Sequence, residues 1–158
     1  MPVDVNKGEK GVPVITQSFA SSQVCPGETW KVYLKASDPG GDMKTLYCVI
    51  DQPGRGMYPV GHTRIPEDQQ RELSGYLYLN TAGVAGPDFA SIVLRVEIQD
   101  GAGNFSEPVS FPLDFNARAL QEPPPPDAFE EKDLGPIMIQ LRTVGDDDRP
   151  NLFHRFRR

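Results

Sequence analysis

The stretch Phe89–Phe115, which reads FASIVLRVEIQDGAGNFSEPVSFPLDF, decides the fold class of this 158-residue chain. Apolar side chains occupy every second position on both sides of a DGAGN turn: Ile92, Leu94, Val96 and Ile98 before it, and Val109, Phe111, Leu113 and Phe115 after it. A period of two gives a β-strand one apolar face, and an Asp-Gly turn between two such strands is typical of a hairpin. The stretch therefore predicts a β-hairpin at the centre of a β-sandwich.

Shorter alternating runs between turn signals extend this pattern toward the N-terminus. They predict four more strands, at Val12–Phe19 on a sheet edge, Glu28–Ser37, Met43–Asp51 and Arg71–Thr81. Residues 52–70 are rich in proline and glycine, which is unsuited to a central strand or a helix and favours a long connection between sheets. No segment has a convincing 3.6-residue apolar period. We therefore expect an all-β fold with little helix, an antiparallel β-sandwich of about seven strands.

The composition changes after Asn116, and this change suggests how the chain is divided. We expect an N-terminal extension at residues 1–11, the sandwich at 12–116, a proline-rich acidic linker at 117–135 and a C-terminal extension at 136–158. Pro123–Pro126 favour a polyproline II stretch within the linker. Ile137–Val144 is apolar enough to predict one more strand in the extension.

Residues Glu28–Phe115 resemble a bacterial immunoglobulin-like or fibronectin type III-like sandwich domain. The resemblance rests on TWKVYLKASDPGG, residues 29–41, as the second strand and its turn, and on VLRVEIQDGAGNFSEPVSFPL, residues 93–113, as the last hairpin. Trp30 lies on the second strand, where fibronectin type III-like domains tend to carry it, and the disulfide of antibody-type domains is missing. The resemblance implies an immunoglobulin-like fold. It transfers no catalytic or ligand-binding residue, because such domains bind through variable loops and edges.

The charge balance and the apolar content of the chain exclude several classes of protein. Asp and Glu exceed Lys and Arg by 22 to 16, a net charge of −6, which argues against a nucleic-acid partner. No run approaches the roughly 20 apolar residues of a membrane-spanning helix. The first residues lack the apolar core of a signal peptide. As written, the chain is expected in the cytoplasm or at the cytoplasmic face of a membrane, and in the periplasm or outside the cell if it is a processed product.

The pattern of cysteine, histidine and serine residues does not favour catalysis. Cys25 and Cys48 are too few for a disulfide scaffold and form no zinc motif. Reduced thiols are favoured over a Cys25–Cys48 bridge, which remains sterically conceivable. Cys48 and His62 are the only candidates for a nucleophile and base, and Cys48 shares the parity of its apolar neighbours. We expect no enzyme activity and no cofactor.

Turn residues with side-chain oxygens raise the question of a calcium site. Asp38 and Asp42 lie in the DPGGD turn, and Asp100 and Asn104 lie in the DGAGN turn. Calcium requires several oxygens at one place, and the two turns are expected at opposite or laterally separated positions of the sandwich unless the topology brings them together. Asp and Asn also favour turns through their own local hydrogen bonds. The sequence therefore predicts no metal site.

The aromatic residues divide between the two faces of the predicted strands. The inward set, expected in the core, is Trp30, Phe89, Phe111 and Phe115. The outward set is Tyr33, Tyr47, Tyr76 and Tyr78. Tyr76 and Tyr78 follow one another on one outer face, which predicts a patch able to contact a partner or a sugar.

The C-terminal segment GDDDRPNLFHRFRR carries the sharpest functional signal. The residues predicted to contact a partner there are Arg149, Leu152, Phe153, Arg155, Phe156, Arg157 and Arg158. Aromatic and arginine side chains anchor protein interfaces, and the same mixture suits anionic lipid headgroups beside a membrane complex. Packing of this segment on its own domain remains the alternative.

Two functions from different classes follow from these patterns. The favoured one is a non-catalytic structural or accessory subunit that docks through its terminal extensions onto a larger protein assembly, including one at a membrane surface. The alternative is a module that binds carbohydrate or a cell-surface polymer through Tyr76, Tyr78 and the Met57–Arg64 loop.

Overall fold

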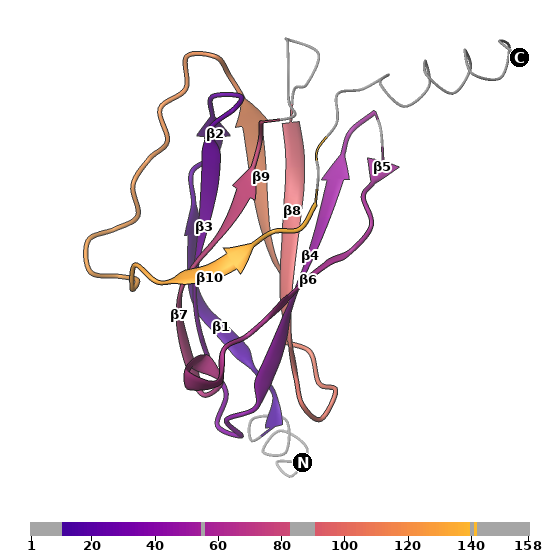
Figure 1. Cartoon of the computed structure of the whole chain (residues 1–158), viewed down its shortest axis with the longest axis vertical. Coiled ribbons are helices and arrows are strands. Elements are labelled where there is room, and N and C mark those ends of the chain that lie inside the picture. The colour runs from indigo at the N-terminus through magenta and orange to yellow at the C-terminus, as the bar shows by residue number, and fades with distance from the viewer. Residues whose placement is uncertain (1–10, 55, 83–90, 140, 142–158) are drawn as a thin grey trace, which may run out of the picture.

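The computed structural model describes residues 11–54, 56–82, 91–139 and 141, which form two β-sheets packed face to face (Figure 1). Sheet A has the strand order β1-β3-β7-β10, and sheet B has the order β2-β9-β8-β4-β5, with β6 also paired to β4. The bounds of the elements are β1 Val14–Ala20, β2 Gln23–Val24, β3 Thr29–Ser37, β4 Met43–Gln52, β5 Gly56–Met57, β6 Gly61–Arg64, the 3-10 helix η1 Glu67–Gln69, β7 Glu72–Asn80, β8 Ser91–Asp100, β9 Val109–Phe115 and β10 Asp133–Pro136. The prediction of an all-β fold is confirmed.

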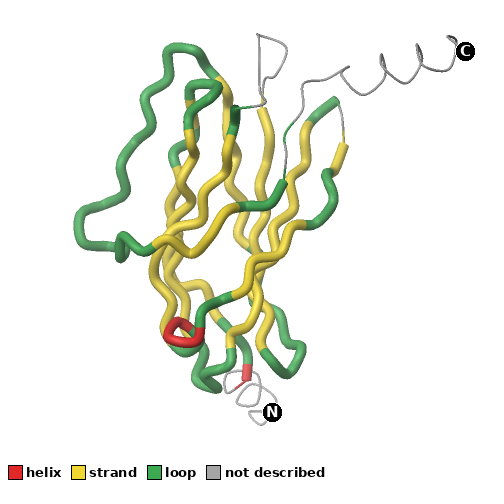
Figure 2. Tube along the Cα trace, in the orientation of Figure 1, coloured by secondary structure: helices red, strands yellow, loops and turns green. Residues whose placement is uncertain are grey.

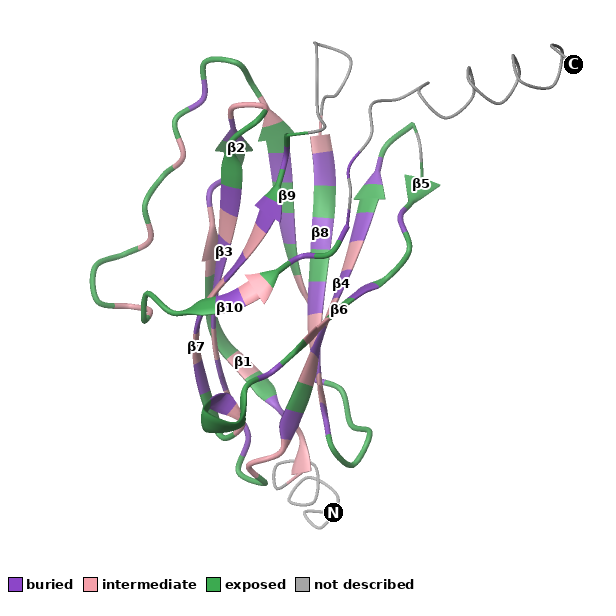
Figure 3. Ribbon diagram, in the orientation of Figure 1, coloured by how far each residue is buried: buried purple, intermediate pink, exposed green. Residues whose placement is uncertain are grey.

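The central hairpin is formed by β8 and β9, which pair antiparallel with Ile92 opposite Leu113 and Leu94 opposite Phe111. The side chains of Ile92, Leu94, Val96 and Ile98 are fully buried. Val93, between two of them, is 37% exposed. Figure 3 shows this alternation of buried and exposed residues along β8, and it confirms the two-residue period as the reason why this segment forms a strand.

The core lies between the inner faces of the two sheets. β3 contributes Trp30, Val32, Leu34 and Ala36, all at most 1% exposed, and pairs with β7 along its whole length. The indole Nε1 of Trp30 donates a hydrogen bond of 2.8 Å to the carbonyl of Ser21. Burying the polar N–H is therefore compensated. Of the other predicted inward aromatics, Phe111 is buried and Phe115 is partly buried, whereas Phe89 lies outside the described residues.

The prediction of an antiparallel sandwich is wrong in one respect, because both sheets are mixed. β2 pairs parallel with β9, and β10 pairs parallel with β7. Both are short edge strands. Their pairing is set by where the chain returns to the sheet, and a run of two or four residues is too short to carry a local period.

The strand predicted at Ile137–Val144 is not found at residues 137–139 and 141, since the last described strand, β10, ends at Pro136, and residues 140 and 142–144 lie outside the described residues. Ile137 and Ile139 are buried instead as part of the hydrophobic core. The apolar side chains of this segment therefore pack into the core. The strand of this region that pairs with β7 is β10, which begins four residues earlier, at Asp133.

Residues 117–139, here called the strap, lead from β9 across the edge of sheet A and back to sheet B. Figure 2 shows their first part as a long loop, and Figure 1 shows β10 passing from β7 toward β6. The amide of Tyr76 donates to the carbonyl of Lys132 at 2.9 Å, and the hydroxyl of Thr63 on β6 donates to the carbonyl of Pro136 at 3.1 Å. Leu134, Ile137, Ile139 and, just after the strap, Leu141 belong to the hydrophobic core. The strap thus closes one side of the sandwich.

A glycine permits the close approach of the strap to β7. A Cβ atom at Gly75 would lie 2.4 Å from the carbonyl oxygen of Lys132 and 2.9 Å from Cγ of Leu134. Contacts this short are repulsive, so any larger side chain at this position would displace the strap.

Candidate functional site

The predicted partner-binding residues fall in two parts of the chain. Residues 142–158 lie outside the described residues, and with them lie Arg149, Leu152, Phe153, Arg155, Phe156, Arg157 and Arg158. Tyr76 and Tyr78 are described, and both are half-buried on the outer face of sheet A. The last described residue before this segment, Leu141, is only 2% exposed.

Tyr76 stands in a cluster of aromatic and charged side chains. Its ring centroid lies 5.6 Å from that of Tyr33 and 6.5 Å from that of Tyr78. The Nζ atom of Lys31 lies 4.3 Å from the centroid of the Tyr76 ring, which is a cation–π contact. Lys31 also forms an ion pair of 3.8 Å with Glu131 of the strap. One face of Tyr76 is therefore already occupied.

Tyr33 has the predicted outward direction but is covered by the strap. Its ring centroid lies 5.5 Å from that of Phe129, and its hydroxyl donates to the Glu131 carboxylate at 3.2 Å. Only 6% of its surface is exposed. Burial, followed by the negative charge of Glu131, raises the pKa of Tyr33 to about 12.

The Met57–Arg64 loop does not join the two tyrosines in one surface. The loop ends in β6, which belongs to sheet B, whereas Tyr76 and Tyr78 belong to sheet A. β10 lies between them, because Pro136 pairs with Tyr78 on one side and accepts the Thr63 hydrogen bond on the other. The structure thus separates the parts of the predicted ligand-binding surface.

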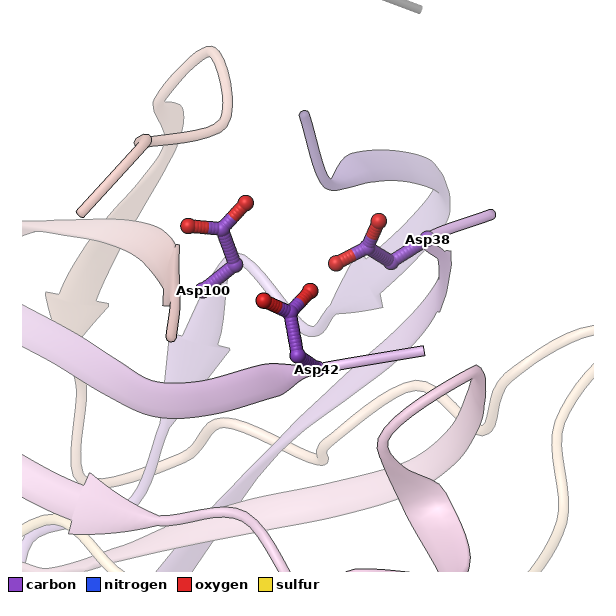
Figure 4. Close-up of side chains that lie close together, drawn as sticks. All are labelled: Asp38, Asp42 and Asp100. Atoms are coloured by element: carbon purple, nitrogen blue, oxygen red, sulfur yellow. The ribbon is translucent and has the colours of Figure 1, made fainter. Parts of the chain in front are cut away.

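Three aspartates meet at the end of the sandwich where β3 and β8 end. One carboxylate oxygen each from Asp38, Asp42 and Asp100 lies within 4.8 Å of the others. Figure 4 shows the three carboxylates grouped around one space. Asp38 follows β3 of sheet A, Asp42 precedes β4 of sheet B, and Asp100 ends β8 of sheet B.

The expectation that these two turns lie apart is wrong, and the strand register gives the reason. β4 and β8 are antiparallel neighbours with Met43 opposite Asp100, so the start of one strand meets the end of the other. The amide of Gly101 donates to the carbonyl of Asp42 at 2.8 Å and holds the two turns together. The turn between β3 and β4 then brings Asp38 to the same place, where the amide of Gly41 donates to the carbonyl of Asp38.

The carboxylate of Asp38 is only partly satisfied by hydrogen bonds. Asp38 is fully buried, and its Oδ1 accepts a hydrogen bond from the amide of Gly40 at 3.0 Å. Its Oδ2 is buried and has no hydrogen-bond partner. Burial raises the pKa of Asp38. The Gly40 hydrogen bond opposes this change, and the neighbouring carboxyls of Asp42 and Asp100 reinforce it.

Asp100 has its own local partners. Its Oδ1 accepts hydrogen bonds from the amides of Ala102, at 3.0 Å, and Asn104, at 2.8 Å. Its Oδ2 accepts one from Nδ2 of Asn104 at 3.2 Å, and the same Nδ2 donates to the carbonyl of Gly11. Asp100 is thus fixed in direction by the turn in which it lies, as the preference of aspartate for such turns leads one to expect.

The two cysteines and His62 do not form a reactive group. Cys25 and Cys48 are unpaired, as the sequence favoured. Cys48 lies in the core, where burial raises the pKa of its thiol to about 12, so the nucleophilic thiolate is disfavoured. The ring of His62 packs edge-on against Tyr47, with the centroids 4.8 Å apart. Tyr47 and Cys48 are successive strand residues, so His62 and the Cys48 thiol lie on opposite faces of sheet B.

Two grooves border the strap. One, of about 660 Å³, lies beside η1 and is lined mainly by charged side chains, and Lys132 and Asp68 within it pair at 3.4 Å. The other, of about 440 Å³, is mostly apolar and lies beside the end of the strap, where Met138 is 69% exposed.

Comparison with known proteins supplies no assignment, since neither a known family nor a curated protein matches the chain. No helix among the described residues is long and apolar enough to cross a membrane.

Proposed function

We propose that the chain is a non-catalytic accessory subunit that docks onto a larger protein assembly through its arginine- and phenylalanine-rich C-terminal segment. The observation that carries this proposal is the anchoring of the strap. Ile137, Ile139 and Leu141 are buried in the core, and Leu141 lies eight positions before Arg149 in the sequence. A segment attached to a rigid base loses less conformational freedom on binding than one attached to a loose linker, which favours its use as an interface.

The sandwich is proposed to be immunoglobulin-like. Its support is the strand order, with β1, β3 and β7 in one sheet and β9, β8 and β4 in the other. This corresponds to the A-B-E and G-F-C arrangement of that fold. The strap is then a proline-rich C-terminal extension of such a domain. In this fold, loops, edges and extensions carry binding, which fits an accessory role.

The non-catalytic part of the proposal is supported by the placement of the candidate groups. The thiol of Cys48 and the ring of His62 lie on opposite faces of sheet B and cannot act as nucleophile and base. The net charge of −6 supports a protein partner over nucleic acid. The alternation of arginine with phenylalanine also suits an assembly at an anionic membrane surface.

A carbohydrate-binding module is the second candidate, and the half-buried pair Tyr76 and Tyr78 is its support. The cation–π contact of Lys31 counts against it, because a sugar would have to displace Lys31 to stack on that face of Tyr76. Titration of the full chain with glycans, followed by intrinsic fluorescence, distinguishes the two candidates. A saturable change that Tyr76→Ser abolishes would favour the sugar-binding role.

The docking proposal is tested by affinity purification from the native source with three forms of the chain. These are the full chain, a form lacking residues 149–158, and a Phe153→Ala/Phe156→Ala variant that keeps every charge. We expect a stoichiometric partner with the full chain, its loss with the deletion, and a reduction of about thirtyfold or more with the double variant, since even one buried aromatic anchor contributes about 2 kcal/mol or more.

Phe105→Ala is the matched control, because Phe105 is an exposed aromatic residue, 47% accessible, directly after the DGAGN turn. It should retain the partner. The proposal is contradicted if the deletion retains the partner at the level of the full chain, or if Phe105→Ala reduces binding as strongly as the double variant does.

A further inference from the structure

The aspartate cluster places carboxylates in a buried position without a neutralising cation in the described part of the chain. Asp38 and Asp100 are 0% and 2% exposed, and the Oδ2 of Asp38 has no hydrogen-bond partner. An ionised carboxylate taken out of water is costly unless a cation or hydrogen bonds compensate it. Among the described residues, no lysine or arginine nitrogen lies within 4.0 Å of the three carboxylates. The group therefore lacks a counter-charge.

Arg71 contacts the DPGGD turn, but its guanidinium is directed toward the backbone of the turn. Its Nη1 donates to the carbonyl of Pro39 at 2.7 Å. A Cβ at Gly41 would lie 2.9 Å from Nη2, which places the guanidinium against the backbone of the turn. Arg71 thus stabilises the turn itself and leaves the Oδ2 of Asp38 without a partner.

We infer that Asp38, Asp42 and Asp100 bind one Ca²⁺ ion. Hard cations prefer oxygen ligands, and Ca²⁺ takes six to eight of them, from carboxylates, carbonyls and water, at about 2.3–2.6 Å. Opposite ligands of one Ca²⁺ are then about 4.6–5.2 Å apart, and the three aspartate oxygens lie within 4.8 Å of one another. Three carboxylates, each binding through one or both oxygens, supply three to six ligands, and water completes the shell.

Mg²⁺ fits the same place less well. It holds its ligands at about 2.0–2.1 Å in a strict octahedron, so that opposite oxygens are only about 4.0–4.2 Å apart. Asp100 is fixed by three hydrogen bonds to its turn, so its carboxylate cannot readily turn to meet the strict octahedral geometry. Selectivity for Ca²⁺ follows from this rigidity.

The bound ion would join the two sheets. Asp38 belongs to the end of β3 in sheet A, and Asp42 and Asp100 belong to strands of sheet B. Calcium should therefore slow hydrogen exchange in the two turns, residues 38–43 and 100–106. This inference is independent of the proposed docking function.

The experiment measures the melting temperature and the heat of binding of the full chain after treatment with EDTA, with CaCl₂ or MgCl₂ added near neutral pH. We expect Ca²⁺ to raise the melting temperature in a concentration-dependent way and Mg²⁺ to act only at much higher concentration. Asp38→Asn should weaken Ca²⁺ binding by about tenfold or more, because it removes a charged ligand. In the absence of metal this variant should be at least as stable as the wild type, since the buried charge is gone.

Asp51→Asn is the matched control, since Asp51 is an exposed aspartate at the opposite end of β4. It should bind Ca²⁺ with the wild-type affinity. Three results would each overturn the inference: no response of the wild type to Ca²⁺ up to about 10 mM, above the range of weak extracellular sites; an equal response to Mg²⁺; or an unchanged Ca²⁺ affinity in Asp38→Asn. Lower stability of Asp38→Asn with an unchanged calcium response would indicate a purely structural role.

Discussion

Tyr33 shows how a single residue on the outer face of a sheet becomes part of the interior. Its strand neighbours Lys31 and Lys35 are half-exposed, yet Tyr33 is only 6% exposed because Phe129 and Glu131 of the strap cover it. A hydroxyl in this position donates well to a carboxylate but loses its proton with difficulty. The strap therefore raises the pKa of Tyr33 and also shields this residue from solvent.

The first prediction concerns the stability of the protein at alkaline pH. The pKa of Tyr33 rises from an ordinary value of 10.0 to about 12 in the folded chain. Between these values the unfolded chain loses the proton while the folded chain keeps it, so Tyr33 lowers the free energy of unfolding as the pH rises. Below about pH 10 its contribution is constant. Urea denaturation across this range should give a smaller pH dependence for Tyr33→Phe than for the wild type.

Tyr78→Phe is the control for this measurement, since it removes a tyrosine hydroxyl from the same face. The effect assigned to Tyr33 is the part of the change that Tyr33→Phe produces and Tyr78→Phe does not. An identical slope for the wild type and Tyr33→Phe would show that the strap does not cover Tyr33 in solution.

At the scale of the elements, the long strands and the short ones have different origins. β3, β4, β7, β8 and β9 each carry a local period of two, and each was predicted close to its observed bounds. β2, β5, β6 and β10 have two to four residues, and their pairing depends on partners distant in the sequence. A prediction made along the chain finds the first kind and misses the second.

The aspartate cluster likewise has one property that the sequence shows and others that depend on the fold. The four turn residues Asp38, Asp42, Asp100 and Asn104 could be recognised from the sequence as oxygen donors. Their convergence could not, because it depends on the register that places Met43 opposite Asp100. The lack of a counter-charge at Asp38 depends further on its burial, which is a property of both sheets together.

The second prediction uses two adjacent residues of the strap that differ in burial. Ile137 is 4% exposed and Met138 is 69% exposed. We expect Ile137→Ala to lower the free energy of unfolding by about 2–5 kcal/mol through lost burial and the cavity left behind. Met138→Ala should change it by no more than about 0.5 kcal/mol. Chemical denaturation followed by circular dichroism measures both.

Equal effects of the two substitutions would contradict the observed burial of Ile137 and exposure of Met138. A small effect of Ile137→Ala together with a large effect of Met138→Ala would indicate that Met138, and not Ile137, faces the core.

At the scale of the whole molecule, the strap and the sandwich share one core. The same hydrophobic cluster contains Trp30 and Leu77 of sheet A, Leu94 of sheet B, and Leu134 and Ile137 of the strap. Residues that share a close-packed interior gain their stabilisation together. The strap is thus energetically part of the sandwich, although its composition is that of a linker.

The third prediction follows from this shared core and concerns cooperativity. The amides of Tyr76 and Ile137 bond to Lys132 and Tyr78, which are pairs between β7 and the strap. We expect these amides to exchange hydrogen with the same opening free energy as the amide of Val32 in β3, because strap and sandwich open together. That value should equal the free energy of unfolding obtained from the fluorescence of Trp30. Faster exchange at Tyr76 and Ile137 alone would show that the strap detaches as a separate unit.

The position of the strap after β9 in the sequence has a consequence for synthesis in the cell. A ribosome adds about 5–20 residues per second, so about one to five seconds separate the completion of β9 at Phe115 from that of Leu141. During this interval the nascent sandwich lacks the side chains of Leu134, Ile137, Ile139 and Leu141 that complete its core. An apolar seam is then exposed beside β7 and β6, where chaperones or a neighbouring nascent chain can bind. Leu134, Ile137, Ile139 and Leu141 cover this apolar surface once they have been made.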